Sequence, residues 1–514
     1  MRFKLLLPLL ALVLITAGCN SDDSNKSSAG GGGGGGGINP NSQPPGQYLQ
    51  SVLAIPSALN DPFLSMAAPW TGAGALNYLW SFDELNVFSL YQHLALPAQE
   101  IVVAVIDTGV DKDHEDLNGR LWMNPVESAG DKYSNGIDDD GNGYVDDFLG
   151  WNFVTNMNNP ADDNGHGTHV AGTIAAIGEN SIGSVGVAPW VRIMALKVCT
   201  SGGGCSSSDI RAAIDYAVAQ NADIINISLG GLDTGPDSIA FDNSIASATQ
   251  AGVLVVVAAG NASSDTSFMS PANATHAVAV AAHRSDGTYC SFSNYGFKLD
   301  ISAPGCALQN GFEVAGIVSA NSKKCGSQGN THCSSRTIGS SAYTLKQGTS
   351  MSAPHVAGMA AVALTASRTA TPLQIRQALL RSSQAIQAGK KHVDYGMGKL
   401  SVTDLINEAQ TAPGIKITSP RYGTSGVGAH TIDMRIEARA HNVAWSLRYQ
   451  VAPFPDNVDL SAGTLITTGV AVAAGQSENP SQSWTPPAAG SYLVILEATA
   501  NGEKYHDMTL VIKP

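Results

Sequence analysis

Three short segments of the chain each place one potentially reactive side chain among small residues. In chain order, these side chains are the carboxylate of Asp107, the imidazole of His166 and the hydroxyl of Ser350. A serine hydroxyl is a weak nucleophile until a base takes its proton, and an imidazole titrates near neutral pH. A carboxylate that accepts the other imidazole N–H would fix the tautomer and stabilise the charged ring. The three residues therefore predict nucleophilic hydrolysis, with Ser350 as nucleophile, His166 as base and Asp107 as orienting group.

The elements around these residues could bring them together. Asp107 follows the apolar run 101–106, which is typical of a buried parallel strand, and open α/β sheets place their sites at the carboxyl ends of strands. His166 and Ser350 each precede a small, apolar stretch that favours a helix. Strands are predicted near Ile101, Ile193, Ile224, Val253 and Ala277, in alternation with helices. This alternation predicts a three-layer α/β/α fold around a parallel sheet.

The three segments resemble the active-site segments of the subtilisin family of serine endopeptidases, in the family's order Asp, His, Ser. They are residues 105–109, 164–169 and 348–355. The resemblance extends from about residue 60 to about residue 409 and implies an endopeptidase that acts on protein or peptide substrates. It also implies that the side chain of Asn261 stabilises the oxyanion of the tetrahedral intermediate, together with the backbone N–H of Ser350.

The resemblance further implies where a peptide substrate binds. It makes 224–231 the strand whose exposed backbone pairs with the substrate, which is recognition by strand addition. It places the glycines 202–204 at the opposite edge, as a mobile lip or a plain flexible loop. The implied substrate-binding residues are Ser228, Leu229, Gly230, Gly203, Ala259 and Gly260. No charged residue stands out as the base of a specificity pocket near 270–272, so we expect a preference for apolar side chains.

Two other functions fit the same sequence. A catalytically silent subtilisin homologue would only bind peptides, and a surface adhesin would act through its C-terminal domain. The silent homologue requires a broken triad, whereas all three members and Asn261 are present. The net charge is −14 and no large basic cluster occurs, which argues against nucleic acid as a partner.

Two loops offer oxygen ligands for a structural calcium ion. The first, 138–147, resembles the first half of an EF-hand loop, with a solvated acidic loop as the alternative. Its predicted ligands are Asp138, Asp140, Asn142, Asp147 and the carbonyl of Tyr144. The second, 178–184, resembles the high-affinity calcium loop of the subtilisin family. The ligands implied there are Asp116, Gly178, Asn180, Ile182 and Ser184.

The N-terminus predicts an export signal. Arg2 and Lys4 precede the apolar run 5–15, which is too short to span a bilayer comfortably. The segment ending at Cys19 resembles a bacterial lipoprotein signal, in which the cysteine is lipidated; ordinary signal cleavage is the alternative. Asn20 follows the cysteine and favours the outer membrane or cell surface. We therefore expect an exported protein that Cys19 anchors to the lipid bilayer.

Changes in composition divide the chain into four regions. After the signal comes a stretch rich in Gly, Ser and Pro, which cannot bury enough apolar area to fold. After about residue 410, short alternating strands predict an immunoglobulin- or fibronectin-like β-sandwich. The predicted regions are a signal peptide at 1–18, a lipidated cysteine and tether at 19–47, a peptidase domain at 48–410 and the sandwich at 411–514.

Seven cysteines are present, and lipidation of Cys19 leaves an even number in an oxidising compartment. The remaining six allow fifteen connectivities. Local closure favours pairs between Cys199 and Cys205 and between Cys325 and Cys333, leaving Cys290 with Cys306. Buried free thiols are the alternative. No Cys-x-x-Cys spacing occurs, so metal ligation by cysteine is not expected.

Overall fold

The computed structural model describes residues 60–64, 78–92, 94–97, 99–309, 311–326, 336–338, 341–386, 390–402, 404–452 and 456–514. The predicted signal peptide, Cys19 and the tether lie outside these residues, and so does Cys333. Within the described ranges, none of the helices combines the length and the apolar character needed to cross a membrane.

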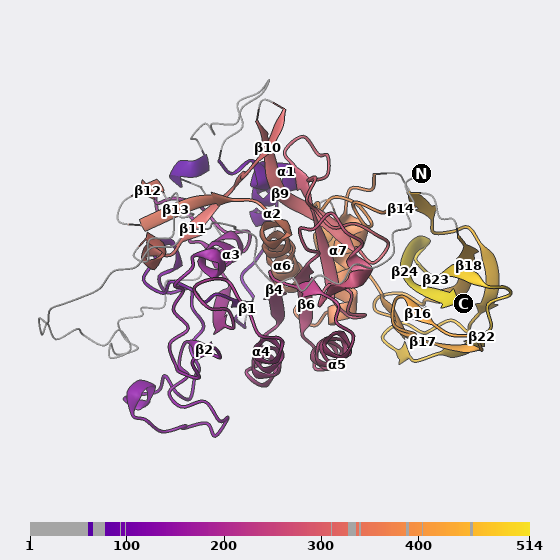
Figure 1. Ribbon diagram of the computed structural model, residues 1–514, viewed down its shortest axis with the longest axis horizontal. Coiled ribbons are helices and arrows are strands. Elements are labelled where there is room, and N and C mark those ends of the chain that lie inside the picture. The colour runs from indigo at the N-terminus through magenta and orange to yellow at the C-terminus, as the bar shows by residue number, and fades with distance from the viewer. Residues whose placement is uncertain are drawn as a thin grey trace, which may run out of the picture.

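An eight-stranded sheet forms the middle layer of the first domain (Figure 1). Strand β1 (Val102–Asp107) lies inside the sheet and pairs in parallel with β3 (Arg192–Lys197) and β4 (Ile224–Ile227). The strand order is β10-β9-β8-β6-β4-β1-β3-β2, and only β10 is antiparallel to its neighbour. The remaining strands are β2 (Gly150–Asn152), β6 (Leu254–Ala258), β8 (Val278–Arg284), β9 (Ile301–Gln309) and β10 (Phe312–Val314).

Helices cover both faces of the sheet because its strands bury side chains on both. Along β1, Val103 and Val105 belong to one apolar core, whereas Ala104 and Ile106 belong to another. The first core includes side chains of α3 (His166–Ala175) and α6 (Thr349–Ala366), and the second includes those of α4 (Ser207–Ala219) and α5 (Pro236–Gln250). The predicted three-layer α/β/α arrangement is confirmed.

Shorter elements complete the first domain. The helices are α1 (Trp80–Leu85), α2 (Val87–Tyr91), α7 (Pro372–Ser382) and α8 (Leu405–Thr411). A small antiparallel sheet consists of β11 (Ile317–Asn321), β12 (Arg336–Ile338) and β13 (Ser341–Lys346). A two-stranded sheet pairs β5 (Gly231–Leu232) with β7 (Met269–Ser270). Thr371 begins α7 with a capping box, because its hydroxyl accepts from the backbone N–H of Gln374.

The C-terminal region is rich in strands and fits a β-sandwich. One sheet contains β15 (Gly414–Ser419), β17 (His430–Glu437), β21 (Ser477–Glu478) and β22 (Ser481–Trp484). The other has the order β16 (Thr424–Ser425), β24 (Glu503–Lys513), β23 (Gly490–Ala500), β18 (Ala444–Val451) and β20 (Thr464–Thr468). Apolar side chains of both sheets, such as Ile432 and Val494, belong to one core.

The two domains are joined by more than the chain between them. Strand β14 (Lys390–His392) of the first domain pairs with β19 (Asn457–Asp459) of the second. Phe297 and Met397 of the first domain pack against a small apolar cluster that includes Leu493 of the sandwich. Figure 1 shows α7 on the side of the first domain that faces the sandwich.

Candidate active site

The carboxylate of Asp107 and the imidazole of His166 form a hydrogen-bonded pair. Asp107 is the last residue of β1 and is buried, whereas His166 begins α3 and keeps 20% of its side chain exposed. His166 Nδ1 lies 2.7 Å from Asp107 Oδ1. Because an ionised carboxylate only accepts, this contact assigns the proton to Nδ1 and leaves Nε2 able to accept one. Gly167 permits the approach, since a Cβ there would lie 2.1 Å from the carbonyl oxygen of Gly109.

A second buried carboxylate, Asp162, fixes the start of α3. Its Oδ1 accepts from the Thr108 hydroxyl and from the backbone N–H groups of Asn164 and Gly165, at 2.8 to 2.9 Å. Its Oδ2 accepts from the backbone N–H and the hydroxyl of Thr168. Asp162 therefore ties the residue after Asp107 to the helix that carries His166. Asp162 was not among the predicted residues, although an aspartate four residues before a catalytic candidate at a helix start is a usable signal.

Ser350 lies in the first turn of α6, which packs against α3. Its Oγ donates to the carbonyl oxygen of Ser228 at 2.9 Å, and among the described residues it makes no hydrogen bond to the His166 ring. In return, the hydroxyl of Ser228 donates to the carbonyl oxygen of Ser350 at 3.0 Å. That carbonyl is free to accept because Pro354, four residues later, has no N–H.

Asn261 follows β6 and lies beside the start of α6. Its Oδ1 accepts from the backbone N–H of Thr349 at 2.9 Å and from the Thr349 hydroxyl at 3.1 Å. These contacts orient the amide and leave its NH₂ group as the available donor. The structure thus brings Asn261 and the first turn of α6 together.

The residues predicted to bind substrate lie at the same edge of the sheet. Ser228, Leu229 and Gly230 follow β4 and lead into β5, while Ala259 and Gly260 follow β6. The backbone N–H of Gly260 donates to the Thr349 hydroxyl at 3.0 Å. The carboxyl ends of β1, β4 and β6 therefore supply the candidate orienting carboxylate, the candidate peptide strand and the candidate oxyanion donor, while α3 supplies the candidate base.

Comparison with known proteins identifies the family. Residues 98–399 match the family model described as the subtilase family. This chain belongs to the subtilase family. It is 33% identical over 355 residues to the thermophilic serine proteinase of Bacillus sp. (strain AK1), a match that spans 67% of this chain and 74% of that protein. Its relatives are named as a serine proteinase and as subtilisins, so this subtilase is a serine endopeptidase, which is a hydrolase.

Two further similarities concern a relative and a solved structure. The subtilase is 36% identical over 305 residues to an extracellular protease of Xanthomonas campestris pv. campestris. That match spans 55% of this chain and 47% of the other protein. A solved structure described as proteases from Pseudoalteromonas arctica PAMC 21717 matches with a TM-score of 0.53 and 26% identity. That match covers 69% of this chain and 100% of the other.

Two disulfides of this subtilase agree with the predicted pairs. Cys199 is bonded to Cys205, and Cys290 is bonded to Cys306. The first disulfide closes the loop 199–205, which contains Gly203, and so restrains its two ends. Within the loop, the backbone N–H of Gly203 donates to the carbonyl oxygen of Thr200 at 2.9 Å. The third predicted pair, Cys325 with Cys333, includes a residue outside the described part and stays a prediction.

The first predicted calcium loop of the subtilase contains an acidic cluster. Carboxylate oxygens of Glu127, Asp138 and Asp140 lie within 4.8 Å of one another, a spacing suited to a cation. Asn142 and Asp147 are adjacent, since the Asn142 amide donates to Asp140 at 3.0 Å and to Asp147 at 2.9 Å. Glu127 was not predicted, because it precedes the loop by eleven residues. Burial raises the pKa of Glu127, which is the expected effect on a carboxylate that lacks a compensating charge.

The neighbouring loop residue Tyr144 donates its backbone N–H to Asn142 Oδ1 at 2.7 Å. Its ring packs edge-on against Trp151 and Tyr216. Tyr216 in turn donates its hydroxyl to the carboxylate of Asp147 at 2.6 Å. Helix α4, which carries Tyr216, therefore supports this side of the loop.

The second predicted calcium loop surrounds Asp116, which is fully buried. Its carboxylate accepts from the Asn180 amide, the Ser184 backbone N–H and the Tyr343 hydroxyl, at 2.7 to 3.0 Å. A second buried carboxylate, Asp61, has one oxygen without a hydrogen-bond partner among the described residues. Burial raises the pKa of Asp116 to about 7 and the pKa of Asp61 to about 6.

The segment that carries Asp61 is held on this loop. The backbone N–H of Glu179 donates to Asp61 Oδ2 at 3.0 Å, and that of Phe63 donates to the carbonyl of Gly183 at 3.0 Å. The loop also contains the predicted carbonyl ligands Gly178 and Ile182. Asp61 and Asp116 are both buried carboxylates, and one oxygen of Asp61 has no hydrogen-bond partner among the described residues. This arrangement fits a cation, and subtilases commonly bind structural calcium.

Proposed function

We propose that this subtilase cleaves internal peptide bonds with Asp107, His166 and Ser350 acting as a catalytic triad. The observation that carries the proposal is the 2.7 Å hydrogen bond between Asp107 and His166, on a helix that packs against the helix of Ser350. Catalysis requires the Ser350 hydroxyl to leave the Ser228 carbonyl and turn to His166 Nε2. A bound substrate favours that rotation, because catalytic hydrogen bonds of free enzymes tighten in the substrate complex.

The proposed reaction has two halves. Ser350 Oγ attacks the scissile carbonyl carbon while its proton passes to His166 Nε2, and the oxyanion accepts from Asn261 Nδ2 and the Ser350 N–H. The intermediate collapses with cleavage of the C–N bond, and the leaving amine takes the proton from His166. Water then attacks the acyl group with the same base, which releases the acid and restores Ser350.

The test is covalent labelling with a fluorophosphonate, which reacts with an activated serine. The adduct is expected on the peptide that contains Ser350. It should be absent from Ser350→Ala and undiminished in Ser208→Ala, which removes an exposed serine on α4. A folded wild-type chain that takes up no probe would contradict the proposal and would leave the peptide-binding homologue as the function.

We propose further that both acidic loops bind calcium. Ligation would neutralise the buried carboxylates Asp61 and Asp116 in one loop and join Glu127 to Asp138 and Asp140 in the other. In the Ser350→Ala chain, which could not digest itself, saturating calcium is expected to raise the melting temperature over excess chelator by about 3 °C for each site. Glu127→Gln should remove part of this response, whereas Asp131→Asn, an exposed neighbour, should not. Superimposable melting curves would refute both sites.

The proposed location is outside the cytoplasm, with Cys19 lipidated. The two observed disulfides support an oxidising compartment. The full chain, expressed in a bacterium fed a clickable palmitate analogue, should acquire the label and partition with membranes. Cys19→Ser should lose both properties. Label-free wild-type protein in the medium would contradict anchoring without affecting the protease assignment.

A further inference from the structure

A buried polar cavity lies between the catalytic domain and the β-sandwich, and none of the proposed active-site residues line it. Six charged side chains line it: Lys298, Asp300, Arg376, Lys391, Lys416 and Asp507. The first four belong to the region that matches the family, and the last two belong to the sandwich. Each is almost fully buried. With four basic side chains and two carboxylates, the lining has a formal excess of two positive charges, and burial lowers the pKa of Lys391 to about 7.

The two carboxylates are already fully engaged. Arg376 Nη2 lies 2.6 Å from Asp300 Oδ1 and 2.9 Å from Asp507 Oδ1. The other oxygens accept backbone N–H groups, from Ala279 to Asp300 and from Ile417 to Asp507. These contacts leave little capacity to neutralise the remaining cations.

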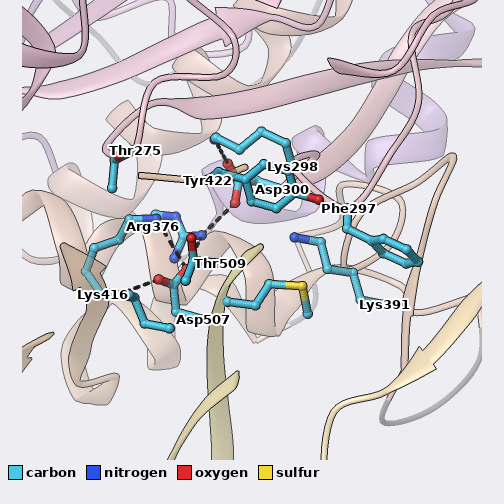
Figure 2. A pocket seen from close by; sticks show the side chains of 12 residues that line it. Thr275, Phe297, Lys298, Asp300, Arg376, Lys391, Lys416, Tyr422, Asp507 and Thr509 are labelled. Carbon is cyan, nitrogen blue, oxygen red and sulfur yellow. Dashed lines mark hydrogen bonds and ion pairs between the residues drawn. The ribbon is translucent and has the colours of Figure 1, made fainter. Parts of the chain in front are cut away.

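Several donors in the cavity therefore lack a full partner. Nε and Nη1 of Arg376 are buried and have no hydrogen-bond acceptor among the described residues. Lys298 Nζ makes a long hydrogen bond of 3.5 Å to the carbonyl oxygen of Ala277 and lies 3.9 Å from Asp300 Oδ2, so no carboxylate pairs with it closely. Figure 2 shows the ammonium of Lys391 pointing toward the same cluster. A buried cation without a close counter-charge destabilises the folded state strongly, so this arrangement favours an additional negative charge.

The size of the cavity limits what that charge could be. The space holds about one water-sized sphere, which is too little for phosphate, sulfate or a carboxylate ligand. We propose that the cavity binds one monatomic anion, chloride under ordinary conditions, and that the bound anion stabilises the contact between the two domains. This inference does not depend on the protease assignment.

The first test is a chloride titration of the Ser350→Ala chain at constant ionic strength, with methanesulfonate as the replacement anion. Chloride is expected to raise the melting temperature along a saturating curve, by about 3 °C at a hundredfold excess over its dissociation constant. Lys391→Met should abolish this rise. Lys390→Met is the matched control, because neighbouring side chains of a strand point to opposite faces, and it should retain the rise. Equal chloride responses in both variants, or none in the parent, would overturn the proposal.

The second test does not depend on how the variants fold. Crystals of the full chain grown with sodium bromide in place of chloride are expected to show one anomalous peak in this cavity, within 3.5 Å of an Arg376 nitrogen. A bromide-saturated crystal with only a water or no density there would overturn the proposal. A peak found only at the protein surface would also overturn the proposal, because it would show an adventitious ion only.

Discussion

Asp107 is buried and His166 is partly exposed, so the imidazole has a carboxylate on one side and is accessible from solvent on the other. This asymmetry is what a general base requires: one ring nitrogen held in a fixed tautomer and one free to exchange protons. Asp162 makes no hydrogen bond to the His166 imidazole or to the Ser350 hydroxyl among the described residues. It nevertheless holds the segment after Asp107 and the start of α3 together through the five hydrogen bonds that it accepts.

At this scale we predict non-additive losses in the proposed triad. Ser350→Ala and His166→Ala should each lower kcat by about 10⁶-fold, the magnitude known for the related subtilisin triad, and the double variant should lose no more. The reason is that nucleophile and base act in one step, so either loss removes the whole step. Peptide hydrolysis followed for the two single variants and the double variant checks this. Single losses that multiply in the double variant would show that the residues act separately.

Asp162→Ala is predicted to destabilise the fold by about 3 kcal/mol or more, because it leaves several buried donors without an acceptor. Urea unfolding in the Ser350→Ala background measures the change. Asp131→Asn, at an exposed carboxylate, should stay within about 0.5 kcal/mol of its parent. In the active chain, Asp162→Asn should lower kcat more than it changes KM, since its proposed effect is on the position of His166. An unchanged kcat would mean that Asp162 only stabilises α3.

At the scale of elements, the long hairpin of β23 and β24 forms the centre of its sheet. Glu497 on β23 faces His506 on β24, and Lys504 lies nearby, with contacts to the carboxylate of 3.2 and 3.0 Å. The hydrogen bond from His506 is the main reason why the pKa of Glu497 falls to about 2 from its usual 4.5, and Lys504 adds to the shift.

This shift predicts how the stability of the hairpin depends on pH. A carboxylate whose pKa is lower in the folded chain contributes stability above its unfolded pKa, and the contribution is lost as the pH falls from about 4.5 toward 2. Glu497→Gln should therefore lower the melting temperature clearly at pH 7 and progressively less between pH 5 and pH 3. Melting curves of both chains across this range check the prediction. A difference that is constant with pH would mean that Glu497 contributes through packing alone.

At the scale of the whole molecule, three kinds of contact cross between the domains: the β14–β19 pair, the apolar cluster around Leu493, and the ion pair of Arg376 with Asp507. One continuous apolar core also includes residues of both domains, such as Leu379 of α7 and Ile436 of β17. Domains joined in this way have little reason to unfold separately.

We therefore predict one cooperative thermal transition for the described part of the chain. Scanning calorimetry of the Ser350→Ala protein in calcium should give a single peak with equal calorimetric and van't Hoff enthalpies. Asp131→Asn, a change at an exposed position in the first domain, should shift the peak by little. Two resolved peaks would show that the sandwich is an independent module on a weak interface.

The sequence alone determined the family, the parallel sheet and the residues proposed for catalysis. It could do so because Asp107, His166 and Ser350 each lie in a short local motif next to a strand or helix. Such a motif consists of residues that are adjacent in the chain, so it can be recognised without the folded structure. The strand-rich character of the region after residue 410 followed from alternation in the same way, and strands such as β17, β18, β23 and β24 correspond to it.

Only the tertiary structure decided which distant residues join these motifs. Asp61 and Asp116 are 55 residues apart in the chain, and each accepts a backbone N–H of the loop 178–184. Glu127 lies outside the loop whose carboxylates it joins, so none of these residues has a local pattern that marks its partner. The charges between the domains come from five separate segments of the chain, and no one of them is unusual in its own segment. Burial makes the charges of these residues costly, because it removes the water that would otherwise solvate and screen them. Burial is a property of the folded molecule, so the sequence alone does not reveal it.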